Sequence, residues 1–110
     1  MEELLKNAEE FLESGNENLK KERFNADVSD YFKAIVILAD YLIYVEIKIM
    51  PKNHNERFPL LKTYFKESYK DISELFDIYT KSYNLRLEKK DADKLKKYAN
   101  EFKNNILNKK

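Results

Sequence analysis

Several residue types are scarce in this chain. Among its 110 residues there is no cysteine and no tryptophan, and there are only one glycine, two prolines and one histidine. The lack of cysteine excludes a disulfide framework and a thiolate metal site, and it suits a reducing compartment. So few turn-forming residues argue against a many-stranded fold, which needs a turn about every 8–12 residues. With a single imidazole, His54, and no Glu-x-x-His repeat, neither a metal nor another cofactor is expected.

An excess of charge of either sign is also missing. The 21 Lys and Arg residues balance 20 Asp and Glu residues, which leaves a net charge of +1 and no global field to draw nucleic acid or an anionic membrane. The first residues lack the basic-then-apolar order of a signal peptide. The most apolar stretch, residues 34–50, is interrupted by the charged residues Asp40, Glu46 and Lys48. Each would cost ~2.5–3.5 kcal/mol at the centre of a bilayer, so we expect a cytoplasmic protein with no membrane partner.

What the chain does contain is helical periodicity, because apolar residues recur at three- and four-residue spacing. This pattern predicts helices at about residues 2–21 and 25–50, a short helix containing residues 58–65, and helices at about 71–86 and from 91 to the last few residues. Asn25, Asp71 and Asp91 are the expected N-terminal caps, and Pro51 is expected to end the second helix. The sequence therefore predicts one all-α domain over residues 1–110, an up-and-down bundle of four to five antiparallel helices.

Two features predict what covers the first two helices. Gly15 lies on the apolar stripe of the first helix, where it costs ~1 kcal/mol relative to alanine, so we expect another helix to approach it closely. The second helix carries apolar residues in nearly every direction and must therefore be covered on nearly every side. Because a chain of this size offers few neighbours, we expect a homodimer in which part of this helix faces a second copy, through Ile37, Tyr41, Tyr44 and Ile47.

The candidate binding residues each have more than one interpretation. His54 either caps a helix or contacts a bound phosphate or partner. Arg86 either interacts with the last carbonyls of its helix or binds phosphate with Tyr79 and Tyr83, which precede it by seven and three residues. The eight tyrosines need partners for any buried hydroxyl, and Asp27, Asp30 and Asp40 of the second helix are the expected acceptors. Such a group forms either a polar seam within the bundle or a ligand pocket that includes Asp30.

Three stretches of the chain, in this order, carry a family resemblance. The first is residues 4–12 together with residues 23–34, and the second is Pro-Lys-Asn-His at residues 51–54. The third is residues 75–86, followed by Asp-Ala-Asp at residues 91–93 opening the last helix. Together they resemble the HEPN domain family, small helical bundles common in archaea and bacteria, over about residues 4–107.

The resemblance implies a choice between two branches of that family. Many HEPN proteins are metal-independent ribonucleases that act as dimers and carry an Arg-x(4–6)-His motif. Arg86 matches the arginine, but residues 91–93 contain no histidine to act as acid or base. The chain resembles more closely the relatives that lack the motif, which are companions of small nucleotidyltransferases or nucleotide-binding modules.

The resemblance therefore implies a non-catalytic HEPN-type module, a homodimer that binds a nucleotide or pairs with a nucleotidyltransferase, in a toxin–antitoxin-like or substrate-binding role. Its expected ligand contacts are Arg86, Tyr83, Tyr79, His54 and Asp30. Two alternatives stay open at this point. One is a ribonuclease toxin that cleaves RNA with a divergent active site, and the other is a purely structural adaptor.

Overall fold

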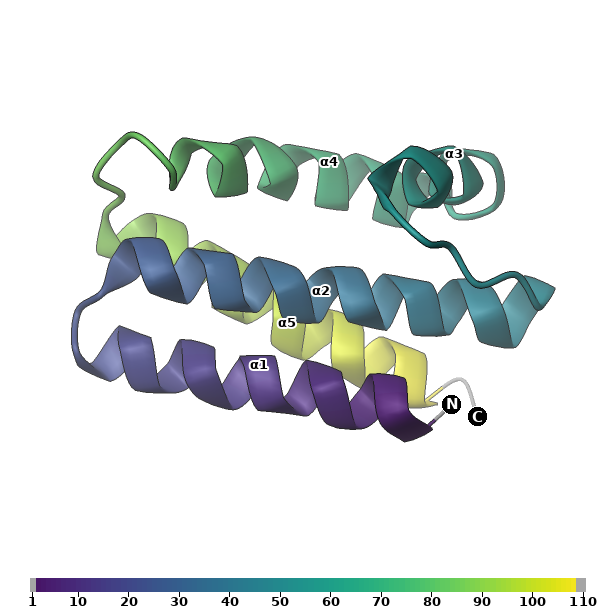
Figure 1. The fold of residues 1–110 in the computed structure, drawn as a ribbon, viewed down its shortest axis with the longest axis horizontal. Helices are drawn as coiled ribbons and strands as arrows, with labels where there is room; N and C mark the ends of the chain where they lie inside the picture. The colour runs from purple at the N-terminus through teal and green to yellow at the C-terminus, as the bar shows by residue number, and fades with distance from the viewer. Residues whose placement is uncertain (1, 109–110) are drawn as a thin grey trace.

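The computed structural model describes residues 2–108, and these residues form helices joined by short loops, with no strand among them (Figure 1). The helices are α1 (Glu2–Lys20), α2 (Phe24–Ile47), α3 (His54–Tyr64), α4 (Lys66–Lys81) and α5 (Lys89–Asn108). The prediction of an all-α helical bundle is confirmed.

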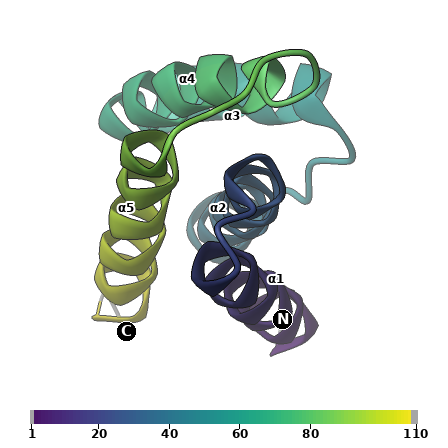
Figure 2. The same ribbon diagram turned by 90° about the vertical axis from the view of Figure 1, so that its left-hand side faces the viewer.

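The longest helix, α2, lies at the centre of the bundle. It contacts each of the other four helices. Figure 1 shows α1 running beside α2 on one side and α4 on the other, with α5 crossing behind, while α3 lies across them and is seen nearly end-on. The end view in Figure 2 shows α5 running down from beneath one end of α4, with α2 beside it and α1 below α2.

The chain itself covers most of α2. Most residues of the helix between Asp27 and Ile43 are buried, among them Val28, Ile35 and Ile43, each at 0% exposure, while Lys33 is exposed. Tyr41 is only 4% exposed, so its expected role in facing a second copy is wrong. All four companion helices contact α2 and cover much of its surface. The homodimer itself stays a prediction.

The expectation of a close approach at Gly15 is confirmed. Gly15 is buried on α1, and a Cβ atom added there would lie 2.7 Å from Cε1 and 2.8 Å from Cδ1 of the Tyr31 ring on α2. Tyr31 is 1% exposed, and its hydroxyl donates a hydrogen bond to Oδ1 of Asn16. The missing side chain at residue 15 therefore makes room for a buried aromatic ring.

Both ends of α2 differ from the prediction. The helix begins at Phe24 after Arg23, which makes no side-chain capping bond, so Asn25 is not the cap. Instead, Nδ2 of Asn25 donates to the carbonyls of Ser82 and Leu85 at 2.8 and 2.6 Å, and its Oδ1 accepts from the backbone N–H of Leu87 at 2.9 Å. Asn25 thereby ties the start of α2 to the loop between α4 and α5.

At its other end α2 stops at Ile47, before Pro51 is reached. Lys48 adopts the left-handed conformation (φ 59°), and its backbone N–H donates to the carbonyl of Tyr44 at 2.9 Å. This is a common way for a helix to satisfy its last carbonyls.

The predicted break at residues 68–71 is also wrong, because α4 begins at Lys66 and Asp71 lies inside it. One non-helical residue, Phe65, separates α3 from α4: its N–H donates to Leu61 at 2.7 Å and its carbonyl accepts from Tyr69 at 2.9 Å. Asp91 lies in the first turn of α5 rather than before it, yet its carboxylate accepts the backbone N–H of Glu88 at 3.0 Å.

Within residues 2–108, no helix is long and apolar enough to cross a membrane. The same part of the chain contains no group of three or more His, Asp or Glu side chains placed to hold a metal ion.

Candidate functional site

An open cavity of about 430 Å³ lies where α1, α2 and α4 meet the N-terminal end of α3. Its volume falls in the ordinary range for small-molecule sites, about 300–1,000 Å³. The lining is aromatic, aliphatic and basic, and no carboxylate of residues 2–108 contributes to it. The lining residues are Phe11, Phe32, Lys33, Val36, Ile37, Lys52, Asn53, His54, Arg57 and Tyr79.

Aromatic rings form one wall of this cavity. The ring of Phe32 on α2 stacks on Tyr79 of α4 with centroids 4.6 Å apart and planes 15° from parallel. The ring of His54 lies 5.5 Å from Phe76 and 6.5 Å from Phe32. Since three helices contribute to this cluster, the wall is fixed by tertiary packing rather than by a single flexible loop.

Arg57 of α3 and Asp40 of α2 form a buried ion pair at the base of the cavity. Nε and Nη2 of Arg57 donate to the two carboxylate oxygens of Asp40 at 2.6 and 2.9 Å. The two residues are each 7% exposed. A two-pronged pair of this kind is geometrically demanding, so it holds the start of α3 in a fixed position against α2.

The same guanidinium orients His54. Nη1 of Arg57 lies 2.6 Å from Nδ1 of His54, and because a guanidinium only donates, the imidazole accepts at Nδ1. Partial burial, with help from the nearby positive charge of Arg57, lowers the pKa of His54, while Asp40 acts in the opposite direction. His54 is thus neutral near pH 7 and carries its proton on Nε2, where it can donate to a ligand.

The N-terminal end of α3 adds positive electrostatic potential to the cavity. The Asn53 side chain accepts the backbone N–H of Glu56 at 3.0 Å, and Glu56 in turn accepts the backbone N–H of Lys52 at 3.0 Å. This reciprocal capping fixes the first turn of the helix. The free N–H groups and the dipole of a helix N-terminus favour anions, and the exposed Lys52 and Lys33 add mobile positive charge.

Two of the five predicted ligand residues, His54 and Tyr79, line the cavity. Tyr83 and Arg86 do not, because α4 ends at Lys81 and both residues lie exposed in the loop that follows. The hydroxyls of Tyr79 and Tyr83 are 2.7 Å apart, and this hydrogen bond, with burial, raises the pKa of Tyr79 to about 12. The loop therefore touches the edge of the cavity wall through a tyrosine pair, while Arg86 does not enter it.

The fifth predicted ligand residue, Asp30, serves a structural purpose. Its carboxylate accepts hydrogen bonds from Ser14 and Asn18 at 2.7 and 2.8 Å and so joins α1 to α2. The predicted pairing of tyrosine hydroxyls with Asp27, Asp30 and Asp40 is wrong for Asp30 and Asp40, whose partners are the residues described above. Asp27 is 0% exposed, and neither of its carboxylate oxygens has a hydrogen-bond partner within residues 2–108.

Sequence reasoning missed the central pair of the cavity. Arg57 is one of only three arginines in the sequence, and no motif includes it, while Asp40 is predicted only as an acceptor for tyrosine. A usable signal was present, since a carboxylate inside a strongly apolar helix needs a charged partner when it is buried. The exposed lysines Lys33 and Lys52 carried no such signal, because only the tertiary arrangement places them at one opening.

A scan of protein-family models, a search of curated proteins and a search of solved structures each give no match to this chain. The function must therefore be argued from the cavity.

Proposed function

We propose that the chain is a non-catalytic binding module of the HEPN type, and that it holds a nucleotide in the cavity between α1, α2, α3 and α4. The phosphate lies at the N-terminal end of α3, within reach of Lys52 and Lys33. The base lies on the aromatic side, against Phe11 or Tyr79. The family assignment comes from the sequence resemblance, and the ligand class comes from the cavity.

One observation carries the ligand class: the cavity combines aromatic walls with basic side chains and a helix N-terminus, and no carboxylate of residues 2–108 lines it. An anion without an aromatic ring would not stack on the aromatic wall, and an uncharged aromatic molecule would not pair with the basic side chains. A phosphate-bearing aromatic molecule satisfies both halves, because base–aromatic stacking contributes about 1–3 kcal/mol per base and phosphate pairs well with helix N-termini.

The charge that meets the phosphate is supplied by the lysines rather than by Arg57. The guanidinium of Arg57 already serves Asp40 and His54, so it positions the wall and leaves few donors for a ligand. Lys33 holds its Nζ 5.7 Å from the centre of the Phe11 ring, at the opening of the cavity. Both lysines are exposed, so they can be exchanged without disturbing the core.

Calorimetric titration with adenosine monophosphate tests the proposal. We expect the Lys33→Ala, Lys52→Ala double variant to lose at least tenfold in affinity, about 1.4 kcal/mol. The Lys81→Ala, Lys89→Ala double variant has the same change in charge away from the cavity, and Arg86→Ala removes the arginine that the sequence suggested; both should bind as the wild type does. Absence of binding to the wild-type protein at millimolar nucleotide would leave the structural adaptor as the better description.

We also propose that the chain forms a homodimer through the last turn of α2 and the segment after it. Tyr44 and Ile47 are half-buried there, and the neighbouring Val45 and Ile49 are 38% and 44% exposed. Ile37, in contrast, lines the cavity. A homodimer would cover this apolar end, and a small nucleotidyltransferase is the alternative partner. Light scattering of a Val45→Asp, Ile49→Asp variant tests the dimer, because the variant should have a mass near 13.3 kDa while the wild type has twice that mass.

A metal-independent ribonuclease is the second candidate, and one contact favours it. Arg57 and His54 are hydrogen bonded in the same cavity, so an arginine and an imidazole lie together although the sequence motif after Arg86 is absent. A neutral His54 has the protonation state of a general base, and the lone pair on Nδ1 would have to leave Arg57 to take up a proton. Cleavage of a labelled RNA that is abolished by His54→Ala, with nucleotide binding retained, would make this the function.

A further inference from the structure

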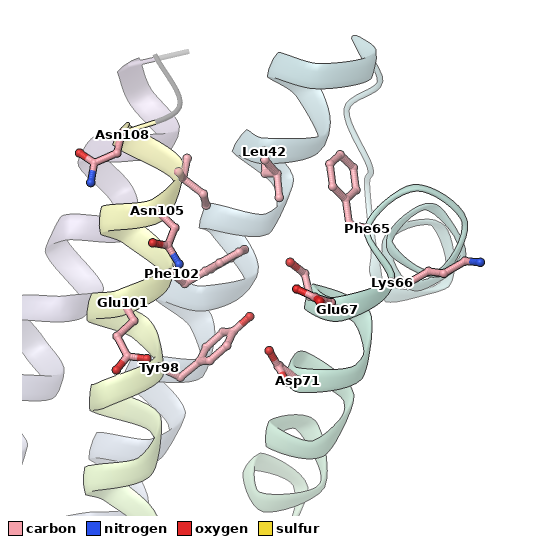
Figure 3. Close-up of a pocket in the computed structure, with 12 residues that line it drawn as sticks. Leu42, Phe65, Lys66, Glu67, Asp71, Tyr98, Glu101, Phe102, Asn105 and Asn108 are labelled. Carbon is pink, nitrogen blue, oxygen red and sulfur yellow. The ribbon is translucent and has the colours of Figure 1, made fainter.

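A second and larger cleft lies on the other side of α4. It has a volume of about 740 Å³ and is bounded by α4 and α5, with α2 beneath (Figure 3). Both this cleft and the nucleotide cavity involve α2 and α4, but none of the lining residues is shared. The two hollows are therefore independent sites on the same bundle.

The rim of this cleft is acidic. Glu67 and Asp71 lie four residues apart on α4, and Figure 3 shows both carboxylates pointing into the gap toward α5, where Glu101 stands on the facing helix. Lys66, the one basic residue among the described residues of the lining, points away from α5. Like charges four residues apart on a helix destabilise it by about 0.2–0.5 kcal/mol, so the folded chain gains nothing from this arrangement by itself.

The rim carboxylates have no fixed counter-ion within residues 2–108. The ion pairs in that part of the chain join Arg57 to Asp40, Lys90 to Glu88, and Lys103 to Glu9. Lys94 and Lys97 line a neighbouring hollow, where Asp71, Tyr98 and Glu101 also contribute, and neither lysine lines the cleft. The cleft therefore presents negative charge that a ligand can neutralise.

The floor of the cleft is apolar and aromatic. Leu42, Phe102 and Ile106 are 4–6% exposed and form its base. The ring of Tyr98 stacks on Phe102 with centroids 5.4 Å apart. Burial, together with the nearby Asp71, raises the pKa of Tyr98. Its ring lines the cleft, and an aromatic face attracts a cation.

We propose that this cleft binds a linear aliphatic polyamine, a chain of methylene groups that carries two or more ammonium ions. Its ammonium groups pair with Glu67 and Asp71 on one helix and with Glu101 on the other. Its methylene groups cover Leu42 and Phe102. Carboxylates on both sides of an apolar floor match a ligand whose charges are separated by hydrocarbon.

The features of the cleft favour this class over other cations. A hydrated metal ion would meet an apolar floor, and the described residues contain no group of side chains placed to hold a metal. A monoamine would leave carboxylates of the facing helix uncompensated. A basic peptide helix would need a longer groove, whereas about 740 Å³ lies in the small-molecule range of about 300–1,000 Å³.

Calorimetric titration of the full chain with spermidine tests the proposal, with hexane-1,6-diol and magnesium chloride as controls. We expect spermidine to bind, the uncharged diol not to bind, and magnesium at equal ionic strength not to displace the polyamine. The Glu67→Gln, Asp71→Asn double variant should lose at least tenfold in affinity and Glu101→Gln severalfold. The control Glu13→Gln, an exposed glutamate on α1, should bind as the wild type does.

Three results would overturn the proposal. The first is equal spermidine affinity for the wild type and for the rim variants, provided that circular dichroism shows all of them folded. The second is displacement of spermidine by magnesium at matched ionic strength, which would reduce the effect to general charge screening. The third is binding of a lysine-rich amphipathic peptide at the rim while spermidine gives no heat, which would assign the cleft to a protein partner.

Discussion

The two ends of α2 bury the same kind of side chain in different ways. Asp40, in the C-terminal half, is held by two hydrogen bonds from Arg57. Asp27, in the first turns, has no hydrogen-bond partner within residues 2–108 and lies near two further acids, Asp30 and Asp93. Burial, followed by the charges of Asp93 and Asp30, raises the pKa of Asp27 to about 7, with Lys96 opposing.

The difference shows how one helix serves two purposes. At the Asp40 end, a charged pair fixes α3 against α2 and so shapes the cavity that we assign to the nucleotide. At the Asp27 end, the acid is tolerated because it can take up a proton, and its surroundings pack α1 and α2 together around Gly15 and Tyr31. In our proposal the Asp40 end shapes a ligand cavity, while the Asp27 end holds α1 and α2 together.

The largest expected effect comes from breaking the paired end. Asp40→Ala leaves the Arg57 guanidinium buried without its counter-ion, which should lower the free energy of unfolding by about 3–5 kcal/mol. The measurement is chemical denaturation at pH 7. The double variant Asp40→Leu, Arg57→Met is the control, since it removes both charges and should regain most of the loss. A single variant as stable as the wild type would show that the pair does not organise this end.

At the other end of α2, the unpaired Asp27 should make the free energy of unfolding depend on pH. The pKa of Asp27 is raised from its usual value of 3.8 to about 7 in the folded protein, so the fold favours the protonated form. Folded protein then holds a proton that unfolded protein has lost, and stability should fall as pH rises from about 4 to about 7, by up to about 4 kcal/mol. Asp27→Asn should remove this slope and be the more stable protein at pH 8.

Asp93→Asn sharpens the same test without touching the buried carboxyl. It removes the larger of the two repelling charges, so the Asp27 carboxyl should titrate at lower pH when followed by carbon-detected NMR. An unchanged midpoint in the variant, or a wild-type midpoint near 4, would contradict the description of this end.

The contact between Gly15 and Tyr31 at the Asp27 end of α2 should tolerate little added volume. Gly15→Ala places a methyl group within 2.7–2.8 Å of the Tyr31 ring. Overpacking of this kind costs about 1–3 kcal/mol, partly offset by the ~1 kcal/mol that alanine gains over glycine in a helix. Thermal unfolding should separate the cost of overpacking from the gain in helix propensity. In the wild-type background Gly15→Ala should lower the stability, whereas in the Tyr31→Leu background, where the side chain is smaller, the same change should raise it.

The smallest expected effect concerns the loop that Asn25 holds. Asn25→Ala removes three hydrogen bonds to the partly exposed segment 82–87 and should lower stability by about 1 kcal/mol. Hydrogen exchange of that segment should rise more than that of α2. Asn25→Asp keeps the acceptor for the Leu87 N–H but sets a carboxylate oxygen against the carbonyls of Ser82 and Leu85, so it should raise the exchange at least as much as alanine does; equal exchange in all three proteins would remove this role.

Helical periodicity was enough to predict the fold, because it depends on local spacing. The helix boundaries were less predictable: residues 68–71 look like a break, yet a single residue, Phe65, turns the chain, and its backbone angles leave no compositional mark. Asn25 has the chemistry of a cap, and the sequence predicts that role, whereas its hydrogen-bond partners lie about 60 residues away. Long-range hydrogen bonds of this kind carry no signal in local sequence.

The candidate site was predicted in part for the same reason. The sequence predicts His54 and Tyr79 as ligand contacts because one is the single imidazole of the chain and the other is a tyrosine on an apolar helix face. Both line the cavity. Arg86 is predicted from a motif that specifies only the number of residues between an arginine and a histidine. Such a motif does not say where the side chain lies in the fold, and Arg86 lies exposed in a loop. The Arg57–Asp40 pair joins residues of two helices, so only the packed bundle reveals it.

The most direct test of the central claim is a ¹⁵N-labelled NMR titration with adenosine monophosphate. If the Asp40 end of α2 shapes a nucleotide site, the amide signals of Lys33, Asn53, His54 and Tyr79 should shift together and saturate, while those around Asp27 stay in place. Shifts confined to the loop at residues 82–88, or no saturable shift at millimolar nucleotide, would contradict it.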